Sequence, residues 1–200
     1  MAPEFLADQI ERGRANLGVD TIDVFYLHNP ETQLGIHTRA EFETRMRRAF
    51  AQLERQVDQG RIRWYGAATW EGFRLAEIAR EEGGPSHHFR FIQLPFNLGM
   101  VEAFVDRPES VLEAAARLGI AVVPSATLLQ TRILANMPDT VQELLPGLAS
   151  HAQRAIPFTR STPGIAVALV GMGRGEHVRA NLGVGKVAPV GREQYSRLHQ

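Results

Sequence analysis

The sequence predicts an α/β protein in which parallel strands alternate with helices. Three observations lead to this class: short apolar segments recur, amphipathic helical segments separate them, and glycines follow several of the helix ends. Parallel strands need such crossover connections, which are almost always right-handed. The alternation therefore favours a parallel sheet covered by helices, whereas the choice between an open sheet and a closed barrel does not follow from the pattern.

The first half of the chain shows this alternation most clearly. Gly18 fits the left-handed position just past a helix end, and apolar residues from Phe42 to Val57 recur at spacings of three and four, which indicates one buried helix face. The predicted elements are, in order, a helix over 4–16, a strand over 22–27, a helix over 39–59, a strand over 62–66, a helix over 71–82 and a strand over 91–94.

The second half continues the pattern less regularly. Ser110 is the expected N-cap of a helix, with Glu113 completing a capping box, and Pro146-Gly147 must break or kink the helix in which it falls. The predicted elements are a helix over 111–118, a strand over 120–125, a helix over 140–154, a strand over 165–170, and helices over 176–182 and 192–199. The whole chain then has five strands in one domain, residues 1–200.

The composition excludes several classes of function. The chain has 200 residues, 44% of them hydrophobic, no cysteine and a formal net charge of zero. Disulfides, thiolate catalysis and cysteine zinc sites are therefore excluded, no other metal site is indicated, and nothing suggests binding to nucleic acid. The sequence has no run of 18 apolar residues, so a membrane span is not expected. Helical residues 1–14 with three carboxylates are unlike a signal peptide, so a cytoplasmic protein is expected.

Two polar residues stand at predicted strand ends, where α/β folds place their chemistry. His28 ends an apolar strand and precedes Asn29-Pro30, and its imidazole could donate a hydrogen bond to a carbonyl oxygen. A structural histidine bonded to backbone is the alternative. Gln93 could pair with another amide, such as a carboxamide, or simply satisfy nearby backbone groups.

A glycine-rich loop near the carboxyl end could bind a phosphate. Gly171, Gly173 and Gly175 would let the backbone approach a ligand, and Arg174 offers a planar guanidinium. The helix expected from Glu176 would direct its amide hydrogens toward the same place. A flexible turn with a solvated arginine is the other interpretation.

Several segments, in order and spacing, resemble the aldo-keto reductase family from about its fourth strand onward: residues 17–30, 53–66, 91–97, 119–125 and 168–182. The resemblance implies a partial TIM (β/α)8 barrel of about five parallel strands whose amino-terminal strands are missing. It also implies NADPH-dependent reduction of aldehydes or ketones to alcohols. The roles it implies are His28 for orienting the carbonyl, Gln93 for the nicotinamide carboxamide, and, for the rest of NADP(H), Ser125, Gly171, Gly173, Arg174 and Asn181.

The chain also departs from this family's pattern. Ala68 and Thr69 stand where a Ser-Asn pair is usual, and Pro124 or Ser125 where an aromatic residue commonly stacks on the nicotinamide. The family's catalytic Tyr, Lys and Asp come from segments before the first matching one. The lysine and the three tyrosines of this chain match none of them: Lys186, Tyr26, Tyr65 and Tyr195. Little or no reductase activity is therefore expected from this chain alone.

Three hypotheses remain from the sequence. The chain is a truncated or split reductase that would act on a small carbonyl substrate once an amino-terminal half completes it. Alternatively, it is a non-catalytic half-barrel that binds a nucleotide or a partner chain. The third hypothesis is a different α/β enzyme with the same alternation of strands and helices. An incomplete barrel leaves open sheet edges, so self-association is expected.

Overall fold

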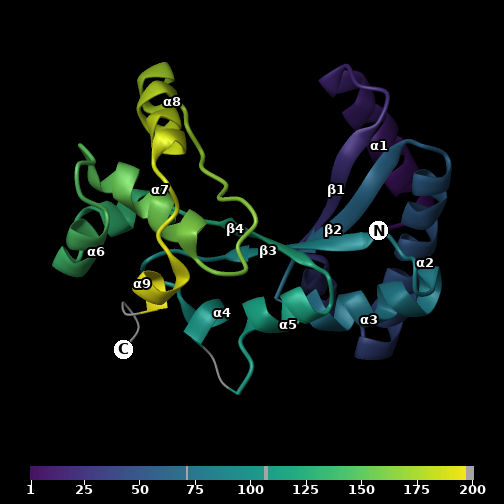
Figure 1. The fold of residues 1–200 in the computed structure, drawn as a ribbon. Helices are drawn as coiled ribbons and strands as arrows, with labels where there is room; N and C mark the ends of the chain where they lie inside the picture. Colours follow the sequence, from purple (N-terminus) through teal and green to yellow (C-terminus); the bar gives the residue numbers. More distant parts are fainter. Residues whose placement is uncertain (71, 106–107, 197–200) are drawn as a thin grey trace. The chain divides into compact units, whose positions relative to one another are not determined.

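The computed structural model describes residues 1–70, 72–105 and 108–196, and for Ser196 its backbone alone. The chain divides into two compact units, Met1–Gln93 and Leu94–Gln200. Figure 1 shows helices packed along strands in the first unit and shorter helices in the second. The single domain over residues 1–200 stays a prediction.

The first unit contains three parallel strands and the helices between them. Its elements are α1 (Pro3–Leu17), β1 (Ile22–His28), the 3-10 helix η1 (Pro30–Gly35), α2 (Arg39–Asp58), β2 (Ile62–Ala68), α3 (Gly72–Gly83) and β3 (Phe89–Pro95), whose last two residues belong to the second unit. Neighbouring strands pair in parallel, β1 with β2 and β2 with β3. The predicted order of helices and strands is confirmed here, although Glu71, the predicted first residue of α3, lies outside the described residues.

Local sequence signals account for the ends of these helices. Gly18 follows α1 with φ 66°, and its amide donates to the carbonyl of Arg14. Thr38 and Glu41 form a reciprocal capping box at the start of α2. Five residues of the predicted apolar stripe of α2 are fully buried, Phe42, Met46, Ala49, Phe50 and Leu53, whereas Val57 at its end is half-buried.

The two faces of this part of the sheet differ in what covers them. One face packs against α2 through a cluster of three aromatic rings, Phe50, Tyr65 and Phe89, whose centroids lie 5.5–5.8 Å apart. These three side chains are fully buried. On the other face Tyr26 and Phe91 make an edge-to-face contact at 6.4 Å. The first face is thus the core of the unit, and the second carries the strand-end residues considered below.

The second unit is built from short helices around one strand. Its elements are α4 (Glu102–Val105), α5 (Val111–Arg117), β4 (Ala121–Ser125), η2 (Leu129–Leu134), α6 (Asp139–Leu144), α7 (His151–Ser161), α8 (Gly175–Leu182), η3 (Gly183–Lys186) and α9 (Arg192–Ser196). The capping box of Ser110 and Glu113 is confirmed. The helix predicted over 140–154 is broken at Pro146-Gly147, as expected there, into the separate helices α6 and α7, and Gly147 between them has φ 74°. Residues 197–199 of the predicted last helix lie outside the described part.

The prediction of five strands is wrong: the described residues form a four-stranded sheet with the order β1-β2-β3-β4. Residues 165–170 run beside β4 but make only an isolated parallel bridge, Val122 with Ile165, and two further backbone hydrogen bonds, Ala166 to Val122 and Leu169 to Pro124. In a parallel ladder the next donor on this side of β4 after Val122 is residue 124. Pro124 has no N–H, so the ladder stops there.

Candidate functional site

The carboxyl ends of β1, β2 and β3 place three residues in one row. His28 is in register with Ala68, and Ala68 is in register with Gln93. Backbone hydrogen bonds hold the strand ends together just beyond this row, from the amide of Asn29 to Ala68 (2.8 Å) and from the amide of Thr69 to Gln93 (3.1 Å). The sequence-predicted pair His28 and Gln93 is therefore brought to the same end of the same sheet.

Residues in register on parallel strands have their side chains on the same face. His28 and Gln93 are two strand spacings apart, or about 10 Å between backbones. The side chain between them is the small methyl group of Ala68, which is buried. This row can receive a flat polar group with hydrogen-bonding atoms at both edges, one for the imidazole and one for the amide.

An aromatic row lies one step toward the amino ends of the same strands. Tyr26 and Phe91 flank Gly66, with which both are in register. A side chain at Gly66 would collide with the backbone and Cβ of Phe91, so a glycine is needed for this close approach. Burial raises the pKa of Tyr26 to about 12, which makes its phenol a poor proton donor near neutral pH.

The loops that follow β1 and β2 meet at Glu31, which the sequence analysis missed. The Glu31 carboxylate accepts hydrogen bonds from the hydroxyl of Thr69 and from the backbone amide of Trp70. The signal that could have found it is a carboxylate placed three residues after a strand-end histidine, directly after a proline. These contacts border the row of His28 and Gln93 at the same strand ends.

In the second unit, Ser125 is the last residue of β4, as predicted. It is half-buried, and its carbonyl accepts a hydrogen bond from the amide of Phe96 at 3.1 Å. Further along, the Thr127 hydroxyl donates to the carbonyl of Leu169 at 2.6 Å and ties the loop after β4 to the extended segment that leads into the glycine loop.

The glycine loop stands open before α8. A Cβ at Gly171 or Gly173 would meet nothing within 4 Å, so backbone atoms here are accessible to a ligand. Arg174 is the N-cap residue of α8, and its side chain is 74% exposed with one long ion pair to Glu176, at 3.4 Å. Asn181 lies half-buried at the other end of this helix. The amide groups of a helix start and an exposed guanidinium are chemically suited to a phosphate.

Comparison with known proteins decides the family. A model of the aldo/keto reductase family matches residues 1–200. The chain belongs to this family. No curated protein matches the sequence significantly.

Solved structures of aldo-keto reductases share the fold. The thermostable aldo-keto reductase Tm1743, in complex with the inhibitor epalrestat, is 23% identical with a TM-score of 0.71 and matches 98% of this chain and 66% of its own. AKR11C1 from Bacillus halodurans, in its holo form, is 17% identical with a TM-score of 0.69, and the match covers 98% of this chain and 65% of AKR11C1. An aldo/keto reductase from Klebsiella pneumoniae, in complex with NADP and acetate, is 17% identical with a TM-score of 0.71, and the match covers 96% of this chain and 63% of the reductase. The chain thus spans about two thirds of the length of these relatives.

The other tyrosines of this aldo/keto reductase family member have packing roles. The hydroxyl of Tyr65 donates to Glu54 at 2.7 Å, and burial followed by this hydrogen bond strongly raises its pKa. Tyr195 is fully buried and accepts a hydrogen bond from Thr162 at 2.6 Å, and burial raises its pKa as well. Lys186 is exposed at the end of η3. The raised pKa values make the phenols of Tyr65 and Tyr195 poor proton donors at neutral pH.

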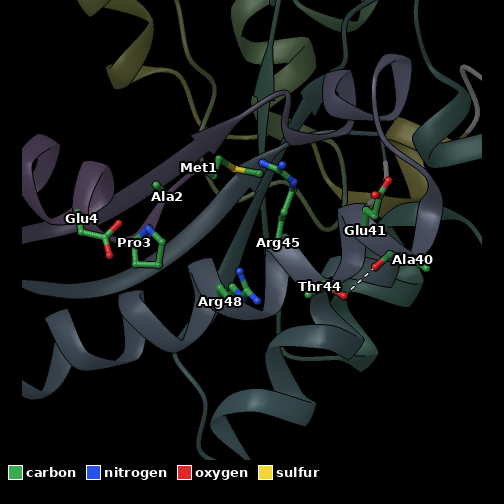
Figure 2. A pocket seen from close by; sticks show the side chains of 9 residues that line it. All are labelled: Met1, Ala2, Pro3, Glu4, Ala40, Glu41, Thr44, Arg45 and Arg48. Carbon is green, nitrogen blue, oxygen red and sulfur yellow. Dashed lines mark hydrogen bonds between the residues drawn. The ribbon is translucent and has the colours of Figure 1, made fainter.

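A cavity of about 740 Å³ lies elsewhere in the first unit, between the start of α1 and the first turns of α2 (Figure 2). Figure 2 shows the Arg45 side chain reaching toward Met1, with Arg48 beside it. None of the predicted site residues lines this cavity. Among the described residues no group of three or more metal-ligating side chains occurs, and no described helix is long and apolar enough to cross a membrane.

Proposed function

We propose that this chain binds NADP(H) and carries the carbonyl-binding end of an aldo-keto reductase site. The observation that supports this most is the row His28–Ala68–Gln93 at the carboxyl ends of three parallel strands. Binding sites of parallel α/β folds lie at this end. The Klebsiella pneumoniae relative is described as a complex with NADP and acetate, which supports the choice of cofactor.

Each residue in the row has a defined task in this proposal. His28 donates an imidazole N–H to the oxygen of an aldehyde or ketone and stabilises the negative charge that develops there. Gln93 pairs its amide with the nicotinamide carboxamide, and Ala68 leaves room for the ring. NADPH, when bound, supplies the hydride to the carbonyl carbon. Ser125 would contact the cofactor from the end of β4.

The second unit carries the residues proposed for the other end of the cofactor. Gly171 and Gly173 admit the ligand to the backbone, Arg174 pairs with the 2′-phosphate, and Asn181 binds near the adenine. Two observations support this assignment: the Arg174 side chain is exposed, and no described atom lies within 4 Å of a Cβ placed at Gly171 or Gly173.

A second candidate is nucleotide binding without turnover. The raised pKa values of Tyr26, Tyr65 and Tyr195 favour it, because the reduced carbonyl oxygen needs a proton and these phenols release theirs poorly. The order of the matching motifs supports a correspondence to the carboxyl-terminal part of the family's barrel. The proton donor and part of the carbonyl site would then come from residues other than 1–200. A positioned acid contributes roughly 10²–10⁴ in rate, so we expect almost no aldehyde reduction by this chain alone.

The sheet edges suggest a further property of the chain. On its outer side β1 has no partner strand among the described residues. Such an edge offers unpaired backbone groups to another chain, so we propose that the protein self-associates. We also propose that it is a cytoplasmic protein. Sedimentation velocity tests the self-association: we expect a mass above that of one 22.2 kDa chain. A stable single-chain species at all concentrations would contradict it.

Titration of NADPH fluorescence tests the proposed function. We expect the fluorescence to change on addition of the protein, and Arg174→Ala to raise the Kd about tenfold by removing a charge-assisted bond to phosphate. Arg117→Ala is the matched control, since Arg117 is also an exposed arginine of the second unit and pairs with Glu109. Unchanged NADPH fluorescence with the unmodified protein would contradict cofactor binding, and turnover of a simple aldehyde would contradict the need for an external proton donor.

A further inference from the structure

One carboxylate joins the two loops that leave the strand ends of the first unit. Glu31 accepts a hydrogen bond from the Thr69 hydroxyl at 2.8 Å and another from the Trp70 amide at 3.3 Å, although these residues are 38 and 39 positions away in sequence. We propose that Glu31 is a positioning residue, which fixes the loop after β2 and so holds the Trp70 indole where it can stack on a planar ring bound at His28 and Gln93. This inference rests on the proposed binding of NADP(H).

The sequence places Glu31 through a sharp reversal of the chain after His28. Asn29 adopts the left-handed conformation, with φ 46° and ψ 53°, which asparagine tolerates better than most residues. Pro30 then starts the 3-10 helix η1, and both the amide and the hydroxyl of Thr32 donate to the carbonyl of Asn29. The turn brings the Glu31 carboxylate back across the end of β2.

The loop that receives this carboxylate is also tied to β3. Thr69 is buried, with 6% of the residue exposed, and its amide donates to the carbonyl of Gln93 at 3.1 Å. Thr69 therefore contacts Glu31 on one side and Gln93 on the other. A displacement of the loop would move the backbone of Gln93, so Glu31 acts on the cofactor site through Thr69 and not by direct contact.

Trp70 combines a fixed backbone with an exposed side chain. Trp70 is 70% exposed, while its amide donates a hydrogen bond to Glu31. Its Cα lies no more than about 7 Å from that of Ala68, because one residue spans at most about 3.6 Å. An indole has the reach and the flat face needed to stack on a nicotinamide or on an aromatic carbonyl substrate bound over Ala68.

The experiment uses Trp70 as its own probe. The chain contains two tryptophans, so the full-length Trp64→Phe protein reports on Trp70 alone, and phenylalanine keeps an aromatic ring at position 64. The first readout, without cofactor, is the fluorescence anisotropy of Trp70 and its quenching by acrylamide. The second is quenching by NADP⁺, which does not absorb at the emission wavelength of indole and therefore quenches by contact.

We expect Glu31→Ala to lower the anisotropy, to increase acrylamide quenching and to raise the Kd for NADP⁺ about tenfold. Glu31→Gln keeps one acceptor oxygen and should give an intermediate effect of about threefold. If the Glu31→Ala protein fails to fold, the Glu31→Gln protein still tests the positioning role. Glu11→Gln is the matched control, because Glu11 pairs with Arg14 and Arg61 at the amino ends of the strands, and it should change neither readout.

The outcomes separate this inference from the proposed function. Unchanged anisotropy and Kd in both Glu31 variants would overturn the positioning role even if NADP⁺ binds. NADP⁺ binding without any quenching of Trp70 would overturn the stacking role of the indole. If NADP⁺ does not bind to the Trp64→Phe protein or to the unmodified chain, the proposed function fails, and with it the role toward the cofactor, while the anisotropy still decides whether Glu31 fixes the loop.

Discussion

The two units of the chain differ in how regularly they are built. In the first, helices of 15, 20 and 12 residues alternate with strands of seven residues. In the second, the longest described helix, α7, has 11 residues, and η2 contains Gln130 and Thr131 with positive φ. The proposed site residues divide in a similar way: His28 and Gln93 stand on strand ends of the first unit, whereas in the second unit only Ser125 ends a strand and Gly171, Gly173 and Arg174 belong to a loop.

This difference teaches how each unit can hold a ligand. A parallel ladder fixes the spacing of His28 and Gln93 before anything binds, so the first unit is suited to orienting a reacting group. Gly171, Gly173 and Arg174 stand on an exposed loop whose backbone can adapt to a phosphate. The regular unit would thus set geometry, and the irregular unit would supply affinity.

Glycine substitutions give the largest expected contrast between the units. Gly66→Ala should lower the free energy of unfolding by about 3 kcal/mol, because its Cβ would overlap the backbone of Phe91 in a packed sheet. Gly171→Ala is the matched change in the second unit and should have almost no effect, since nothing lies within 4 Å of its Cβ. Urea denaturation measures both. Equal effects would show that the two glycines are in similar surroundings.

Glu54→Gln should destabilise the first unit by about 2 kcal/mol at pH 7, because the Glu54 carboxylate accepts hydrogen bonds from the Tyr65 hydroxyl and from the backbone and ring of His88. Burial raises the pKa of Glu54, but these hydrogen bonds outweigh it and leave the pKa below its ordinary value.

The same group gives an expected pH dependence. Since the folded-state pKa of Glu54 is lowered, its stabilisation is present above the ordinary carboxyl pKa of about 4.5 and is lost as the pH falls through the folded value. The urea midpoint of the unmodified protein should therefore fall with acidification in this range, and Glu54→Gln should flatten the decrease. A variant with the same pH profile as the unmodified protein would contradict the role of this carboxylate.

A smaller effect is expected in the second unit. Tyr195→Phe removes the buried hydrogen bond from Thr162 and should cost about 1 kcal/mol of unfolding free energy. Tyr26→Phe is the matched control in the first unit, because Tyr26 is half-buried and its hydroxyl lies on the side of the sheet away from α2. A loss of stability larger for Tyr26→Phe would reverse the expected order.

The same contrast explains what the sequence could predict. Strong apolar periodicity, as in α2, and glycines at helix ends identified the three α-helices and three strands of the first unit, and the strand-end positions of His28 and Gln93 followed from them, whereas η1 was not predicted. The second unit was harder because its conformations are tertiary in origin. The missing ladder bond at Pro124 removed a predicted strand, and the contacts of Glu31 depend on a left-handed Asn29 that no local pattern required.

Amide hydrogen exchange with and without NADPH tests the central claim most directly, because it reports on both units in one measurement. We expect NADPH to slow exchange at residues 27–31 and 91–97, near His28 and Gln93, and also at residues 171–182, around Arg174. Protection confined to residues 171–182, or absent from both regions, would contradict the claim that the strand-end row binds the nicotinamide.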